Sequence, residues 1–298
     1  MSAHAPVGFV GLGTMGTPIV TRLVGAGHAV QAFDVNEAAL ARAADAGARA
    51  AAGVGDAVRG CAAVFVAVSN QDVLGQVLRE PGGILDSAAP GCVVVDLGTT
   101  SPPRSREYAR EAAARGLGYL DAPLSGSTPW ALEGRLAVMV GGSDADYARC
   151  QPLLQTFGGN IFHLGPVGAG QTAKLCHQLA FMGTLIGISE ALAAGERCGI
   201  DPGRLIEVLD ACVAPRHVTS FMAPRLAGDG APMTGALRLF KKDLQAVQDM
   251  ATQDAHLDLP LGRVLLAFFE QAVEAGEVDH DPFRLHELVA RGVFRVPQ

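Results

Sequence analysis

The chain has 298 residues, a length that suggests about two domains. Hydrophobic residues make up 49% of it, and this composition excludes an intrinsically disordered chain. The formal charge of −7 and the scattered basic residues give no footprint for nucleic acid or for an anionic membrane surface, so we expect neither partner.

The start of the chain, MSAHAPVGFVGLG, lacks a charged region followed by a long apolar core, so we expect no signal peptide. An uncharged apolar run of ~18 residues, the length of a membrane span, is also missing. The 6 cysteines are widely spaced and show neither a CxxC pair nor zinc-type spacing. We therefore expect reduced thiols in a cytoplasmic protein without a metal site.

Short apolar runs that read as buried strands alternate with helical stretches in the first half of the chain. The strand-like runs are residues 7–13, 29–34, 62–69, 92–99, 117–124 and 136–142. Residues 17–28 and 36–48 read as helices. This rhythm predicts a mostly parallel, doubly wound sheet, and the continuous apolar runs fit burial on both faces.

After residue 165 the strand-like runs stop, and helical periodicity takes over in residues 202–213, 237–255 and 260–277. Asp201-Pro202 and Asp281-Pro282 read as helix starts. We therefore predict an α/β domain over residues 1–165 and an all-helical domain over residues 166–298. Between them, residues 165–196 read as a long, mostly apolar helix.

A glycine loop follows the first strand-like run. Gly11, Gly13 and Gly16 form a GxGxxG pattern between a predicted strand and a predicted helix. Gly11 permits the tight turn, Gly13 lets the backbone approach a pyrophosphate, and Gly16 lets helix and strand pack closely. The helix N-terminus then offers free N–H groups to the phosphates. The loop residues predicted to bind a dinucleotide are Gly11, Leu12, Gly13, Thr14, Met15 and Gly16.

The next strand ends in Asp34, 23 positions after Gly11, close to the spacing expected of a dinucleotide fold. Its carboxylate would accept hydrogen bonds from the adenosine ribose and would repel a 2′-phosphate. The sequence thus favours NAD over NADP, with Val35 and Asn36 beside the cofactor. The alternatives are a purely structural glycine turn and a plain surface acid.

Four segments together carry a family resemblance: residues 8–18, 121–142, 165–178 and 241–247. In order and separation they resemble the β-hydroxyacid dehydrogenases, the group that includes 3-hydroxyisobutyrate, tartronate semialdehyde and 6-phosphogluconate dehydrogenases. The resemblance implies a Rossmann-like N-terminal domain, a long interdomain helix, an all-α C-terminal domain, and a homodimer or homotetramer.

The resemblance also implies roles for single residues. Lys174 matches the catalytic lysine of the family. Ser125 and Gly126 match its substrate-binding motif, and Lys242 with Asp243 matches a later lysine–aspartate pair near substrate and cofactor. The loop residues matched to the cofactor are Val68, Ser69, Asn70 and Thr99.

The sequence departs from the family pattern at three positions. Gln178 stands where asparagine is usual, and His177 before it resembles the phosphogluconate branch of the family. Ser127 ends a motif that usually reads SGG, and Trp130 replaces a usual glycine. We assign these four residues to the substrate pocket, with the alternative that Trp130 packs at a domain interface.

The chemistry implied is hydride exchange between a nicotinamide and a small β-hydroxyacid or its semialdehyde. Lys174 would take the hydroxyl proton during oxidation and return it during reduction. Ser125, Gly126 and Ser127 would hold the substrate carboxylate, and Gln178 the reacting oxygen or a neighbouring group. Two alternatives stay open: an imine reductase-like enzyme that uses NADPH, and a catalytically silent dinucleotide-binding protein.

Overall fold

The computed structural model describes residues 5–197, 199–211, 216–228, 233, 235–250, 252–253 and 260–295. The chain divides into two compact units, Met1–Lys174 and Leu175–Gln298. The division lies inside a long helix, nine residues beyond the end predicted for the first domain. Each unit is described by itself.

The first unit is built on a six-stranded sheet with the strand order β3-β2-β1-β4-β5-β6. Every neighbouring pair in it is parallel. The strands are β1 (Val7–Val10), β2 (Val30–Phe33), β3 (Arg49–Ala50), β4 (Ala63–Val66), β5 (Val93–Asp96) and β6 (Gly118–Asp121). This is the strand order of a dinucleotide-binding sheet. Strands β2 and β3 are added on one side of β1, and β4, β5 and β6 on its other side, so the order of strands reverses between β1 and β4.

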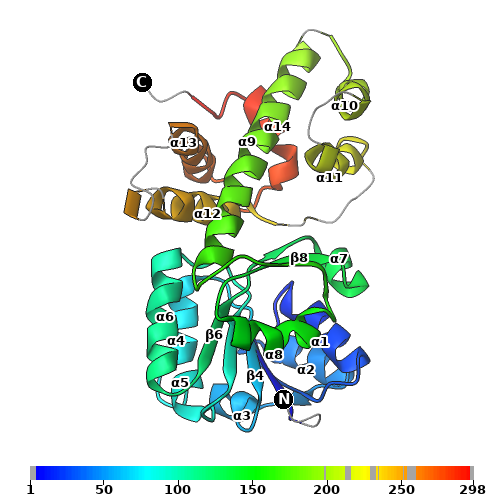
Figure 1. The fold of residues 1–298 in the computed structure, drawn as a ribbon. Coiled ribbons are helices and arrows are strands. Elements are labelled where there is room, and N and C mark those ends of the chain that lie inside the picture. The colour runs from blue at the N-terminus through cyan, green and yellow to red at the C-terminus, as the bar shows by residue number, and fades with distance from the viewer. Residues whose placement is uncertain are drawn as a thin grey trace. The chain divides into compact units, whose positions relative to one another are not determined.

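Side chains of successive strand residues enter two separate cores, one on each face of the sheet. Phe9 and Phe65 belong to one core, and Val64 and Val66 to the other. Figure 1 shows one group of helices on each side of these strands. On the Phe9 side lie α1 (Gly16–Gly25), α2 (Glu37–Asp45) and α8 (Asp144–Leu154). On the other side lie α3 (Val54–Val58), α4 (Gln71–Arg79), α5 (Ile84–Ser87) and α6 (Pro102–Ala114). The predicted burial of both sheet faces is confirmed.

A second, three-stranded sheet follows β6. It has the order β7-β8-β9 and consists of β7 (Leu124–Ser125), β8 (Leu136–Val140) and β9 (Gly158–His163). Helix α7 (Thr128–Glu133) lies between β7 and β8, which run antiparallel. The run at residues 136–142 therefore does not extend the main parallel sheet. Leu136, Val138 and Val140 still enter the Phe9-side core.

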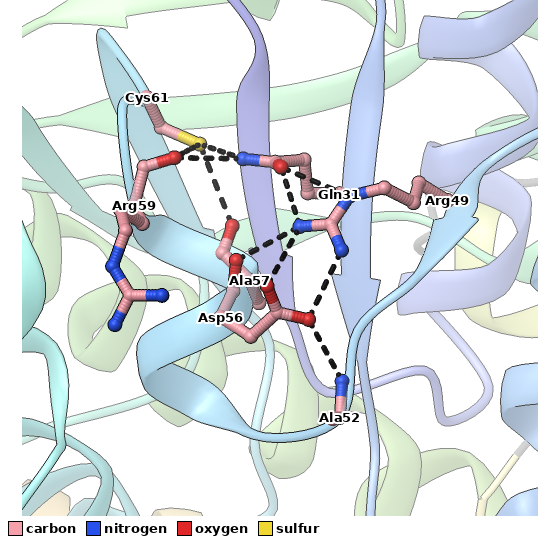
Figure 2. Close-up of polar contacts among 7 residues, drawn as sticks. All are labelled: Gln31, Arg49, Ala52, Asp56, Ala57, Arg59 and Cys61. Carbon is pink, nitrogen blue, oxygen red and sulfur yellow. Dashed lines mark hydrogen bonds and ion pairs between the residues drawn. The ribbon is translucent and has the colours of Figure 1, made fainter.

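The short edge strand β3 is held by side chains at the amino ends of the strands (Figure 2). The Arg49 guanidinium donates to Gln31 Oε1 at 3.0 Å and to Asp56 Oδ2 at 3.0 Å. Gln31 Nε2 in turn donates to the buried Cys61 Sγ at 2.9 Å. Two residues of β3 pair with β2 through the backbone. The side-chain contacts add further bonds from β3 to β2 and to α3.

Helices form the described part of the second unit. They are the later part of α9 (Ala169–Arg197), α10 (Pro202–Ala211), α11 (Arg216–Leu226), α12 (Leu237–Met250), α13 (Pro260–Glu274), the 3-10 turn η2 (Pro282–Arg284) and α14 (Leu285–Ala290). The three predicted helices here are α10, α12 and α13; residues 212–213, 251 and 254–255 of the predicted ranges lie outside the described residues. Asp281 caps η2 by accepting the N–H of Phe283, as its Asp-Pro signature predicts.

An aromatic cluster lies in the core of this unit, where Phe181, Phe240, Phe269 and Phe283 pack in a chain of ring contacts. Within the described residues, none of the helices combines the length and the apolar character needed to cross a membrane.

Candidate functional site

The loop after β1 has the geometry of a phosphate cradle. Gly11 has φ +97°, and a Cβ there would lie 2.3 Å from the carbonyl oxygen of Ala67. A Cβ on Gly16 would lie 1.9 Å from the carbonyl oxygen of Gly11. At Gly13, by contrast, a Cβ would meet no atom of the described chain within 4 Å. Two glycines are therefore required by the fold itself, while Gly13 leaves room for a bound group.

Helix α1 begins directly behind this loop. No described side chain caps its N-terminus at Met15, and its first turn holds no acid. Thr14 is exposed beside it, and the Thr17 hydroxyl donates to the Leu12 carbonyl at 2.7 Å. An uncapped helix N-terminus next to an open glycine suits a phosphate group.

The carboxylate of Asp34 lies at the end of β2, against this loop. Its Oδ2 atom accepts the N–H of Leu12 at 2.5 Å, and its Oδ1 atom accepts the N–H of Asn36 at 2.8 Å. Val35 is 90% exposed, an unusual state for an apolar side chain and one that suits a flat ring packed on it. Asn36 caps α2 by accepting the N–H of Ala39.

A groove of about 550 Å³ joins the glycine loop to Asp34. Its lining consists of Leu12, Gly13, Thr14, Thr17, Pro18, Thr21, Asp34, Asn36, Ala39, Arg42, Thr128 and Leu132. Arg42, Thr128 and Leu132 are among the lining residues that were not predicted from the sequence. They come from the second turn of α2 and from α7, which packs on α1. The volume and the donor set fit the adenosine and pyrophosphate end of a dinucleotide.

Two further loops leave the carboxyl ends of β4 and β5. The first holds the half-buried Val68, the exposed Ser69, and Asn70, which caps α4 by accepting the N–H groups of Asp72 and Val73. The second holds the half-buried Thr99. The two loops approach each other, since a Cβ on Gly98 would lie 3.4 Å from the Val68 carbonyl oxygen.

The predicted carboxylate-binding motif lies in the small sheet. Ser125 is the last residue of β7, Gly126 has φ +139°, and Ser127 precedes α7. Trp130 packs beside Gly126, where its ring would lie 3.1 Å from an added Cβ, and the Arg135 guanidinium lies over its ring. The left-handed φ explains why position 126 is glycine, and an added Cβ would also lie only 2.6 Å from the Leu136 side chain.

Lys174 lies in the second turn of α9 and is 9% exposed. The start of this helix is held by Asp121, at the end of β6. Asp121 accepts the N–H of Gly168 at 2.7 Å and the N–H of Gln171 at 2.8 Å. Burial raises the pKa of Asp121 to about 7, against the lowering effect of these two N–H groups. Neither Asp121 nor Gln171 was assigned a role from the sequence, although both lie in the matched motifs.

The remaining predicted residues lie in the second unit. Gln178 is buried, and its Nε2 group donates to Asp243 Oδ2 at 2.5 Å. Lys242 Nζ lies 3.4 Å from Asp243 Oδ1, so Asp243 contacts both side chains. The exposed His177 stacks on Phe181. The sequence predicted the pairing of Asp243 with Lys242. The bond between Asp243 and Gln178 was not predicted.

Comparisons with known proteins agree with this geometry. The family model described as the NAD binding domain of 6-phosphogluconate dehydrogenase matches residues 6–165. The model described as NAD-binding of NADP-dependent 3-hydroxyisobutyrate dehydrogenase matches residues 168–289. The chain is 34% identical to an NAD-dependent L-serine dehydrogenase of Pseudomonas aeruginosa, over 92% of this chain and 94% of that one. The chain belongs to the β-hydroxyacid dehydrogenase family.

Other relatives extend this family assignment. A 2-(hydroxymethyl)glutarate dehydrogenase of Eubacterium barkeri is 31% identical over 91% of this chain and 90% of its own length. A solved 3-hydroxyisobutyrate dehydrogenase of Salmonella typhimurium aligns with a TM-score of 0.86 and 31% identity, over 95% of this chain and 99% of that one. As a β-hydroxyacid dehydrogenase, the chain is an NAD(P)-dependent oxidoreductase.

An imine reductase of Myxococcus stipitatus, solved with NADP+, also aligns, with a TM-score of 0.65 and 22% identity over 95% of this chain and 99% of that one. At this identity the likeness is one of fold alone.

Proposed function

We propose that this β-hydroxyacid dehydrogenase exchanges a hydride between NAD and a small β-hydroxyacid or its semialdehyde, with Lys174 as the general acid and base. The observation that carries the proposal is the placement of Lys174. It lies one helical turn after Gln171, whose side chain contacts the loop that carries Thr99. When bound, the nicotinamide supplies the hydride acceptor or donor.

Lys174 has one task in this scheme. An amine beside the substrate hydroxyl takes its proton as the alcohol is oxidised and returns a proton as a carbonyl is reduced. A positioned acid or base of this kind contributes about 10²–10⁴-fold to the rate. The low exposure of Lys174 keeps bulk water from competing for that proton.

NAD is the proposed cofactor because of Asp34. Both of its oxygens already accept a backbone N–H, so the carboxylate is fixed in place at the wall of the groove. A fixed negative charge favours ribose hydroxyls and repels a 2′-phosphate. Arg42, which lines the same groove, opposes this preference with its positive charge.

A small carboxylate is the proposed substrate class. Ser125, Gly126 and Ser127 offer two hydroxyls and successive backbone N–H groups, the kind of donors that a carboxylate needs. Relatives of similar identity are named for L-serine and for 2-(hydroxymethyl)glutarate, acids that differ in size and charge. The substrate is therefore proposed only as a class.

The test is a substrate panel with matched variants. L-serine, 3-hydroxyisobutyrate and 2-(hydroxymethyl)glutarate are offered with NAD and with NADP, and formation of NADH or NADPH is followed. We expect Lys174→Met to lower kcat by about 10²–10⁴-fold while NADH still binds. Lys241→Met, which removes the same charge from a partly exposed site, serves as the control. Full turnover by Lys174→Met contradicts the role of the lysine. Oxidation of NADPH with cyclic imines alone contradicts the substrate class.

A further inference from the structure

We propose that Gln171 is a positioning residue that sets the loop Gly98–Thr100 against the helix that carries Lys174. This loop follows β5, in the opposite half of the sheet from Asp34, and a dinucleotide bound across the reversal of strand order would bring its nicotinamide end to this half. This role of Gln171 rests on the proposed function, since it concerns the same site. All of the contacts that carry it lie within the first unit.

The side chain of Gln171 binds the loop on both sides of Thr99. Its Nε2 group donates to the Gly98 carbonyl at 2.9 Å, and its Oε1 atom accepts the N–H of Thr100 at 3.0 Å. The amide thus pairs with the loop as a neighbouring peptide group would. Thr99 lies between the two bonded positions, so the peptide groups on both sides of it are held.

The backbone of the same residue is held from the other direction. The N–H of Gln171 donates to the carboxylate of Asp121 at the end of β6. The loop in turn is braced by Asp96 at the end of β5, which accepts the N–H of Gly98 at 2.9 Å and the hydroxyl of Thr100 at 2.8 Å. Gln171 is therefore the link between the loop after β5 and the start of α9.

This arrangement requires an amide. Gln171 is fully buried, and a buried polar group is tolerated only where its hydrogen bonds are made. The loop presents one acceptor and one donor, so the opposing group must supply one donor and one acceptor. A methionine of similar length supplies neither, and a carboxylate supplies only acceptors. A purely apolar residue would fill the space and leave both loop groups unpaired.

The adenosine end of the cofactor has other supports. Asp34 and the glycine loop follow β2 and β1, and they make no bond to Gln171 among the contacts described. Loss of the Gln171 side chain should therefore weaken binding of the nicotinamide end of the cofactor and leave binding of the adenosine end unchanged. A general loss of folded structure would weaken binding of both ends.

The experiment compares NAD with ADP-ribose, which lacks the nicotinamide, by calorimetry on the whole chain. For Gln171→Met we expect the affinity for NAD to fall about tenfold and that for ADP-ribose to change by less than about twofold. Gln31→Met is the control, because it makes the same substitution in a partly exposed side-chain network at the opposite ends of the strands. We expect it to leave both affinities unchanged.

A second variant tests the donor itself. In Gln171→Glu the new carboxyl group can donate to the Gly98 carbonyl only when it is protonated. Asp96 on β5 contacts the side chain at this position, and Asp121 on β6 accepts its backbone N–H. Tyr119 contacts Asp96, and Lys174 follows one helical turn later on α9. The affinity of Gln171→Glu for NAD, relative to that of the parent, should therefore rise as the pH falls. Gln171→Met has no group to titrate and should show no such recovery.

Two results overturn the proposal: an equal loss of NAD and ADP-ribose binding in Gln171→Met, and no loss of either. Both results come from binding affinities alone, so they test the role of Gln171 whether or not the protein oxidises a hydroxyacid. If the parent binds NAD but oxidises no acid on the panel, the proposed function fails while the role of Gln171 is still decided by the affinity ratio.

Discussion

The carboxylate of Asp34 accepts the backbone N–H of Leu12 at 2.5 Å, across 22 positions of sequence. This bond joins the acid after β2 to the glycine loop after β1. The residue that we propose to select the cofactor therefore also holds in place the loop that would bind the phosphates.

Asp34→Asn should weaken the preference for NAD. The variant keeps one acceptor oxygen and loses the charge that repels a 2′-phosphate. We expect the ratio of kcat/KM for NAD to that for NADP to fall about tenfold or more, since a hydrogen bond to a charged group contributes ~1.5–3 kcal/mol. Glu37→Gln, which removes an exposed acid outside the groove lining, is the control. An unchanged ratio in Asp34→Asn contradicts this assignment.

Gly13→Ala and Gly16→Ala should separate binding from folding. The Cβ added at Gly13 meets no described atom of the chain within 4 Å, so the free energy of unfolding should stay nearly constant while NAD binding weakens. The Cβ added at Gly16 meets a carbonyl oxygen at 1.9 Å, and such overpacking costs about 1–3 kcal/mol. Urea unfolding and calorimetry measure the two effects. Normal NAD binding by Gly13→Ala contradicts the phosphate cradle.

The stability of the first unit should depend on pH through Asp121. Its pKa rises from 3.8 to about 7 on folding, so the folded state binds this proton more tightly than the unfolded chain does. The stability that this group contributes is complete below about pH 4 and is lost as the pH rises through 7, at up to ~1.4 kcal/mol per pH unit. The nearby charge of Asp96 also raises the pKa of Asp121, and the charge of Asp121 in turn raises the pKa of Tyr119.

The measurement uses the single tryptophan of the chain, Trp130, which reports on the first unit. Urea unfolding followed by its fluorescence at several pH values should show the parent losing stability relative to Asp121→Asn between about pH 4 and 7. A difference between the two proteins that does not vary with pH argues against a titrating Asp121.

Arg49→Met should loosen the edge strand β3. The variant removes the donor that joins Gln31 to Asp56 (Figure 2), and we expect backbone amide exchange around Arg49–Ala50 to become about tenfold faster. The central strands β1 and β4 should keep their protection. Arg59→Met is the control, since Arg59 enters this cluster through its carbonyl oxygen and not its guanidinium. Equal effects from both variants indicate that loss of charge alone is responsible.

The same guanidinium holds the pKa of Asp56 below its usual value. In Arg49→Met this pKa should rise toward 3.8, and NMR titration of the carboxyl carbon would detect the change. The stability that the pair contributes is present above the usual pKa and is lost as the pH falls through the lowered one.

Much of the first unit could be predicted from local sequence. Apolar runs at residues 62–69 and 92–99 became the central strands β4 and β5, because strands buried on both faces cannot carry alternating polar residues. The glycine loop and Asp34 could be predicted because their spacing reflects one βαβ unit. The small sheet could not, because the run at residues 136–142 is as apolar as a strand of the main sheet, and its residues do not indicate the antiparallel pairing with β7.

Some residues of the candidate site could be singled out from the sequence, and others could not. Residues such as Lys174 and Ser125 belong to recognisable motifs. Asp121 and Gln171 act through partners that lie 47 to 75 positions away, and no local pattern reports such distances. Arg42 and Leu132 reach the groove only because α2 and α7 both pack near α1.

Asp96 and Asp121 are register partners on β5 and β6, so two fully buried acids lie side by side. Like charges opposite one another disfavour a sheet, and here the donors from the loop after β5 and from α9 compensate. The two acids therefore join β5 with its following loop, β6 and the start of α9 into one hydrogen-bonded unit. Loss of either carboxylate would leave N–H groups of a neighbouring segment without their acceptor, so we expect these three segments to loosen together rather than one by one.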